Sequence, residues 1–140
     1  MMELKVIDET LAVAAQMQPE ELAALAEQGF VAVICNRPEG EEQDQPMLDD
    51  MRAAAQGAGL AFHHIPVSGG LFPPAAVAAF AAIRRGTPGK VLAYCRTGTR
   101  AATLDALANV HGLSVAERLS RAGEAGYDLS ALAERMEACG

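Results

Sequence analysis

The 140-residue sequence contains no tryptophan, and aromatic residues make up only 4% of it, although hydrophobic residues account for 51%. A core must therefore be built from Ala, Val, Leu, Ile and Met side chains. The longest apolar run, AAVAAFAAI at 75–83, is far shorter than the roughly 20 residues of a membrane-spanning helix. Acidic residues also stand at the N-terminus, where a secretory signal needs basic ones. We expect one domain over residues 1–140, cytoplasmic and without a membrane partner.

Basic residues are few as well, because 11 Lys and Arg face 18 Asp and Glu, which gives a net charge of −7. Nucleic-acid binding needs a basic surface, so this balance excludes nucleic acid as a partner. Three cysteines, Cys35, Cys95 and Cys139, form an odd set without C-x-x-C spacing. That set argues against a disulfide framework and against a zinc site. We expect neither a metal nor an organic cofactor.

Apolar runs of strand length alternate with helical patterns along the chain. Strands are expected at 30–35, 60–67 and 90–94, helices at 18–29, 46–58, 73–86 and 99–110, and a helical C-terminal part at 114–139. This alternation predicts an α/β fold, a three-layer α/β/α sandwich with a mainly parallel central sheet. In such sheets ligands bind beyond the carboxyl ends of the strands.

The stretch YCRTGTR at 94–100 places Cys95 at such a strand end, directly before a helix. Backbone N–H groups and the positive end of the helix dipole stabilise a thiolate there. Together with Arg100 they would lower the pKa of Cys95 from about 8.5 into the range of roughly 3.5 to 7.5. The alternative, a small buried hydrophobe, is the commoner state of a free cysteine. A core cysteine, however, does not need two arginines, two threonines and a glycine within five residues.

Residues 10–107 resemble the phosphatase-like domain of the bacterial beta-lactamase hydrolase-like family, also called DUF442. The resemblance is carried by LAVAAQMQPEELAALAEQGFVAVICNRPEGEE, LAFHHIPVSGG and VLAYCRTGTR. It implies a fold similar to that of dual-specificity and tyrosine phosphatases, with the cysteine loop at one end of the sheet. The domain is also found fused to metallo-β-lactamase-type sulfur dioxygenases, which implies work on persulfides or sulfide beside a sulfur-oxidation partner enzyme.

Phosphatases of that fold have five residues between the cysteine and the arginine, whereas this chain has four: Arg96, Thr97, Gly98 and Thr99. They also use an aspartate, about thirty residues before the cysteine, to protonate the leaving oxygen. No Asp or Glu lies between Ala61 and Tyr94, and Ser68 stands near the expected place. Losing a general acid costs about 10² to 10⁴ in rate. Sulfur transfer escapes this cost, because sulfite or a thiolate leaves without a proton.

We therefore expect a sulfurtransferase that moves sulfane sulfur from thiosulfate or a persulfide to a thiol such as glutathione, through a persulfide on Cys95. The spelling C-R-x-G-x-R is also similar to the active loop of rhodaneses. Cys95 and Arg100 would be catalytic, and the four loop residues between them would bind the substrate. Two alternatives stay open: a phosphatase acting through a phospho-thiolate on Cys95, and a non-catalytic module that binds an anion or senses persulfide.

Arg37, which follows a predicted strand, is a further candidate for substrate binding. Its alternative role is an ion pair with one of the nearby acids, Glu39, Glu41 or Glu42. One of these acids would supply a phosphatase with its proton donor if their loop folded over Cys95. Cys35 ends a strand near the same sheet edge and is expected to be a buried hydrophobe, although a disulfide to Cys95 is conceivable. His63 and His64 point to opposite faces of a strand and are expected to have structural roles. Met47 and Met51 share helical spacing and are expected to lie in the core.

Overall fold

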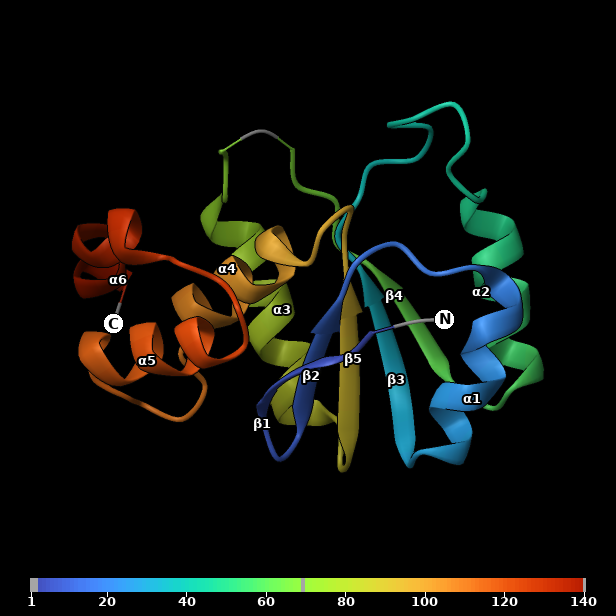
Figure 1. Cartoon of the computed structure of the whole chain (residues 1–140), viewed down its shortest axis with the longest axis horizontal. Helices are drawn as coiled ribbons and strands as arrows, with labels where there is room; N and C mark the ends of the chain where they lie inside the picture. Colours follow the sequence, from blue (N-terminus) through green and yellow to red (C-terminus); the bar gives the residue numbers. More distant parts are fainter. Residues whose placement is uncertain (1–2, 69, 140) are drawn as a thin grey trace.

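The computed structural model describes residues 3–68 and 70–139 and contains a five-stranded sheet in the order β1-β2-β5-β3-β4 (Figure 1). The strands are β1 (Lys5–Asp8), β2 (Leu11–Ala14), β3 (Phe30–Cys35), β4 (Ala61–His64) and β5 (Lys90–Tyr94). Only β1 runs antiparallel to its neighbour, whereas β2, β5, β3 and β4 pair in parallel. The central strands β5 and β3 are apolar along almost their whole length because helices cover the sheet on both sides.

Helices form the outer layers. They are α1 (Leu22–Glu27), preceded by the 3₁₀ turn η1 (Pro19–Glu21), α2 (Leu48–Gly57), α3 (Pro74–Gly86), α4 (Thr99–Ala108), α5 (Val115–Glu124) and α6 (Ala133–Cys139), preceded by the 3₁₀ turn η2 (Ser130–Leu132). One core cluster joins the sheet to α1 and α2, and a second joins the other face to α3 and α4. Figure 1 shows α5 and α6 outside α4, so the C-terminal part extends the second layer, and α5 also packs against the edge strand β1.

The predicted fold class is confirmed: the sheet is mainly parallel and lies between helical layers. The expected strands at 30–35 and 90–94 are β3 and β5, whereas the third, expected at 60–67, is regular only from Ala61 to His64. The β1–β2 hairpin was not predicted, because its strands are only four residues long. Met51 is buried as expected, but Met47 is mostly exposed, so its expected core role is wrong. No helix in the described part of the chain is long and apolar enough to cross a membrane.

A buried ion-pair network fastens the edge of the sheet far from Cys95. The guanidinium of Arg84, near the end of α3, donates to Asp105 of α4 at 2.7 Å and to Asp8 of β1 at 3.1 Å. It also donates to the hydroxyl of Thr10 at 2.6 Å. A single side chain thus ties the hairpin to both helices of one layer, and its two carboxylate partners are largely buried.

Candidate active site

The cysteine loop lies at the carboxyl edge of the sheet, directly after the central strand β5. Cys95 is only 1% exposed, and its own N–H donates to the carbonyl of Ala14 at the end of β2. The chain then turns back at Gly98, whose N–H donates to the sulfur of Cys95 at 3.1 Å. Gly98 has a φ of +95°, a conformation that residues with a β-carbon rarely adopt. Of the several backbone donors expected around the cysteine, the N–H of Gly98 hydrogen-bonds to its sulfur.

Arg100, in the first turn of α4, lies against Cys95 from the other side. Both Cys95 and Glu41 stabilise the guanidinium and raise the pKa of Arg100, with Glu41 the larger influence. One terminal nitrogen of Arg100 also donates to the carbonyl of Val67 at 2.7 Å, in the segment after β4. Loops that follow three parallel strands thus converge on one arginine, as the topology of the sheet requires.

Glu41 is the ion-pair partner of Arg100, a pairing that the sequence analysis did not predict. Its two carboxylate oxygens accept from the two terminal nitrogens of Arg100 at 2.9 and 2.8 Å, a bidentate pair. The hydrogen bonds from Arg100, and further ones from Arg37, lower the pKa of Glu41 to about 2. Glu41 is therefore a carboxylate at any physiological pH.

Arg37 stands behind Glu41 and is almost fully buried. Each of its three guanidinium nitrogens donates to a nearby side chain: Nε to Glu41 and Nη2 to Glu42, both at 2.8 Å, and Nη1 to Gln16 at 2.9 Å. Its carbonyl also accepts from His64 at 2.7 Å. This placement favours the ion-pair alternative over a direct contact with substrate, with Glu41 and Glu42 as partners. Glu39 instead accepts from the N–H of Leu48 at the start of α2.

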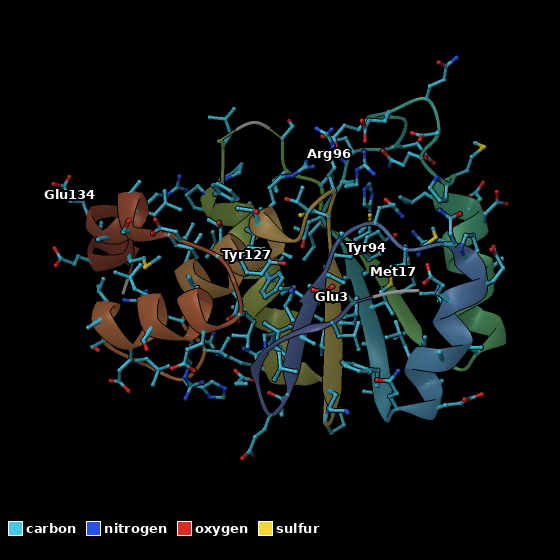
Figure 2. All side chains as sticks on the ribbon, in the orientation of Figure 1. Glu3, Met17, Tyr94, Arg96, Tyr127 and Glu134 are labelled. Carbon is cyan, nitrogen blue, oxygen red and sulfur yellow. The ribbon has the colours of Figure 1, made fainter. Side chains whose placement is uncertain are left out.

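The remaining predicted loop residues lie at the surface. Arg96 is exposed near the top of the molecule in Figure 2, with Glu42 3.4 Å away. The hydroxyl groups of Thr97 and Thr99 hydrogen-bond to each other at 3.1 Å. Tyr127, between α5 and α6, donates from its hydroxyl to the carbonyl of Thr97 at 3.2 Å. The C-terminal part therefore contacts the cysteine loop, and no local sequence motif predicts this contact.

Cys35 and Tyr94 are partners in the register of β3 and β5, and both belong to the core on the α1 and α2 side. Burial raises the pKa of the Cys35 thiol, so it stays protonated. Successive side chains of a strand point to opposite faces of the sheet. Cys95, the residue after Tyr94, therefore does not face the core on the α1 and α2 side. Cys35 and Cys95 are both free thiols, and Cys35 is the buried hydrophobe that was expected.

Asn36 directly follows β3, as Cys95 directly follows β5, and its N–H donates to the carbonyl of Tyr94 at 2.8 Å. Its side-chain amide donates to the carbonyl of Ile65 at 2.9 Å. The other side-chain atom, Oδ1, is buried and has no partner among residues 3–68 and 70–139. Among the described residues, this end of the sheet thus holds a buried acceptor without a partner.

Comparison with known proteins agrees with this geometry. Residues 3–112 match the family model described as "Beta-lactamase hydrolase-like protein, phosphatase-like domain". Beta-lactamase hydrolase-like proteins are 38% identical over 130 residues in Xylella fastidiosa strain Temecula1 and 40% identical over 98 residues in Agrobacterium fabrum. These matches cover 90% and 70% of this chain but only 30% and 23% of the relatives, so the chain spans less than a third of their length.

Among solved structures, a candidate phosphatase of Neisseria meningitidis is 33% identical, with a TM-score of 0.84 over 96% of both chains. PTPMT1 in complex with PI(5)P shares 18% identity, with a TM-score of 0.71 over 97% of this chain and 96% of that one, and shows likeness of fold alone. The chain therefore belongs to the phosphatase-like domain family of the beta-lactamase hydrolase-like proteins.

Proposed function

We propose that this phosphatase-like domain is a sulfurtransferase that carries sulfane sulfur on Cys95, from thiosulfate or a persulfide to a small thiol. Cys95 has the environment of a nucleophile, because the Gly98 N–H points at its sulfur and Arg100 lies beside it. The first-turn N–H groups of α4 have no acceptor one turn earlier in their helix, so they add positive potential at the same place. Such a site holds the anionic sulfur of a substrate and of an enzyme persulfide.

The reaction needs two displacements. The Cys95 thiolate attacks the outer sulfur of the donor, forms a new S–S bond, and releases sulfite from thiosulfate or a thiolate from a persulfide. Cys95 then carries one extra sulfur. An acceptor thiolate attacks that outer sulfur, takes it away as a persulfide, and returns Cys95 to the thiolate. Neither displacement consumes an oxidant or a reductant, and neither requires an acid.

The observation that carries this proposal is the state of Glu41. It is the carboxyl group that bonds to Arg100, and its pKa of about 2 leaves it without a proton at neutral pH. An ionised carboxylate cannot protonate the leaving alkoxide of a phosphate ester. A leaving group that departs as a stable anion makes no such demand, and sulfite and thiolates are of that kind.

Phosphate ester hydrolysis is the second candidate, and the comparisons favour it over sulfur transfer. The family model is phosphatase-like, and the Neisseria structure is described as a candidate phosphatase. The loop of Glu41 does reach the cysteine site, so a carboxyl group is near the reacting centre. Hydrolysis would require a bound phosphate to displace Glu41 from Arg100 and leave it protonated.

Intact mass separates these functions from each other and from a module that only binds anions. The reduced protein would be exposed briefly to thiosulfate or to glutathione persulfide, and then chased with glutathione or cyanide, beside Cys95→Ser. One added sulfur on the wild type alone, lost in the chase, is the expected result. No added sulfur with either donor would overturn the proposal. Phosphate release from an aryl phosphate, absent in Cys95→Ser, would then identify the phosphatase.

A further inference from the structure

The guanidinium groups of the site are already paired with the protein's own carboxylates. Glu41 covers the outer edge of Arg100 with both oxygens and also accepts from Arg37. Glu42 accepts from Arg37 and lies near Arg96. The loops at the cysteine site therefore pair three arginines with two glutamates, which offset most of the positive charge near Cys95. The net charge of the chain, −7, adds no attraction for an anion from outside.

This arrangement bears on the charge of the substrate. A group that binds Arg100 near Cys95 lies one guanidinium away from the Glu41 carboxylate. Two unit charges about 7 Å apart, at the effective dielectric constant of about 20 that suits partly buried sites and with partial screening by salt, repel by an energy that corresponds to roughly tenfold in affinity. Each additional negative charge on the substrate is repelled by the Glu41 carboxylate by a similar amount. Glu41 thus disfavours a dianion more than a monoanion, while a neutral donor is unaffected.

We propose that Glu41 selects the charge of the sulfur donor, so that the site takes a singly charged persulfide in preference to dianions such as thiosulfate or a phosphate monoester. This proposal rests on the proposed sulfurtransferase function for its chemistry, whereas the charge selection itself is a property of the anion site. Glu41 acts through Arg100 and is a specificity residue, not a group that touches the reacting sulfur. Arg37, held in place by Gln16 and Glu42, fixes the position of Glu41.

The first test compares donors. For wild type and Glu41→Gln, kcat/KM would be measured with thiosulfate and with the persulfide of 2-mercaptoethanol, whose only charge is on the persulfide. The wild type should prefer the persulfide, and E41Q should raise the thiosulfate-to-persulfide ratio by about tenfold. A looser hold on Arg100 would lower both values by the same factor and leave the ratio unchanged. An unchanged ratio, or a wild type that prefers thiosulfate, would overturn the proposal.

The second test does not depend on turnover. Protection of Cys95 from iodoacetamide, followed on the Cys95 peptide, reports anion binding, with sulfate as the dianion and nitrate as the monoanion. E41Q should strengthen protection by sulfate about tenfold relative to nitrate. If the wild type transfers no sulfur but this shift appears, the proposed function fails and the charge selection stands. If sulfur is transferred but neither ratio shifts, the function stands and the role of Glu41 fails.

Two control variants keep the result specific. Glu42→Gln removes the same charge from the same loop without touching Arg100, because Glu42 contacts Arg37 and Arg96 instead. It should shift the ratios clearly less than E41Q. Glu134→Gln, on the exposed surface of α6 and far from Arg96 in Figure 2, should leave them unchanged. A shift in Glu42→Gln equal to that in E41Q would contradict a role for the carboxylate on Arg100.

Discussion

The hydroxyl group of Tyr127 occupies the space that a β-carbon at Gly98 would need. The same hydroxyl donates to the carbonyl of Thr97 at 3.2 Å, so the tyrosine closes over the turn of the cysteine loop. Gly98 in turn places its N–H on the sulfur of Cys95. The segment between α5 and α6 is therefore part of what shapes the nucleophile's surroundings, although it lies about thirty residues further along the chain.

Gly98→Ala should lower sulfur uptake by Cys95 more than the strain of an alanine at a positive φ angle alone would. The new methyl group would push against Tyr127, and the loop would move its N–H away from Cys95. We expect Cys95 sulfur uptake to fall at least about tenfold, as for the loss of one donor to a developing charge. Gly40→Ala is the matched control, because Gly40 also has a positive φ, +68°, but open space around its β position. Equal loss of activity in both variants would show that Tyr127 is not the obstacle.

Tyr127→Phe keeps the ring and removes only the hydrogen bond to Thr97. Burial raises the pKa of Tyr127, so the phenol is a donor at neutral pH. Loss of one partly exposed hydrogen bond should lower the free energy of unfolding by about 0.5 to 1 kcal/mol, with a severalfold lower rate of sulfur uptake. Urea unfolding and timed mass spectrometry measure the two effects. A rate identical to that of the wild type would mean that the loop holds its shape without the tyrosine.

Arg100→Lys should abolish most of the reaction while the chain still folds. A lysine retains the charge but cannot hold Glu41 with two parallel bonds and also reach Val67. The loss of a preorganised donor should cost about 10² to 10³ in the rate of sulfur uptake by Cys95. Arg96→Lys, at an exposed position, should change that rate less than about threefold. A rate in Arg100→Lys close to that of the wild type would show that positive charge, not the geometry at residue 100, is what the reaction uses.

Arg84→Met should destabilise the fold without touching the active site. It leaves Asp8 and Asp105 without their shared partner in a largely buried place, which costs about 3 to 5 kcal/mol. Arg85→Met, one residue further and exposed, should stay within about 0.5 kcal/mol of the wild type. Chemical denaturation of the three proteins decides the matter. A small loss at residue 84 would mean that the carboxyl groups protonate or find water at little cost.

Local sequence patterns were sufficient to predict the central strands, because a strand that is buried on both faces of the sheet reads as a continuous apolar run. The runs FVAVIC and KVLAY gave β3 and β5, and the cysteine loop followed from its position after β5. The partner of Arg100 did not follow, because Glu41 is 59 residues away and only the order of the strands brings it near. Met47 shows the converse limit: helical spacing from Met51 suggested a core residue, but Met47 precedes the first turn of α2 and faces solvent.

The pairing of Glu41 with Arg100 also has a signature in the pH dependence of stability. The ordinary pKa of the group, 4.5, is lowered to about 2 in the folded chain, chiefly by hydrogen bonds from Arg100. A carboxyl group with a lowered pKa adds stability above its unfolded pKa and loses that contribution as the pH falls through its folded pKa. The wild type should therefore exceed Glu41→Gln in free energy of unfolding by a constant amount, of the order of 1 kcal/mol, at pH 5 to 8.

Between about pH 4.5 and 2 this difference should shrink toward zero, while Glu134→Gln, which removes an exposed carboxylate on α6, tracks the wild type throughout. Urea titrations at closely spaced pH values measure it, and the comparison of variants cancels the other carboxyl groups that titrate in the same range. A difference that disappears already between pH 7 and 5 would mean that Glu41 binds a proton near neutrality. It would then be available as the acid that phosphate ester hydrolysis needs, and the balance between the two candidate functions would turn toward the phosphatase.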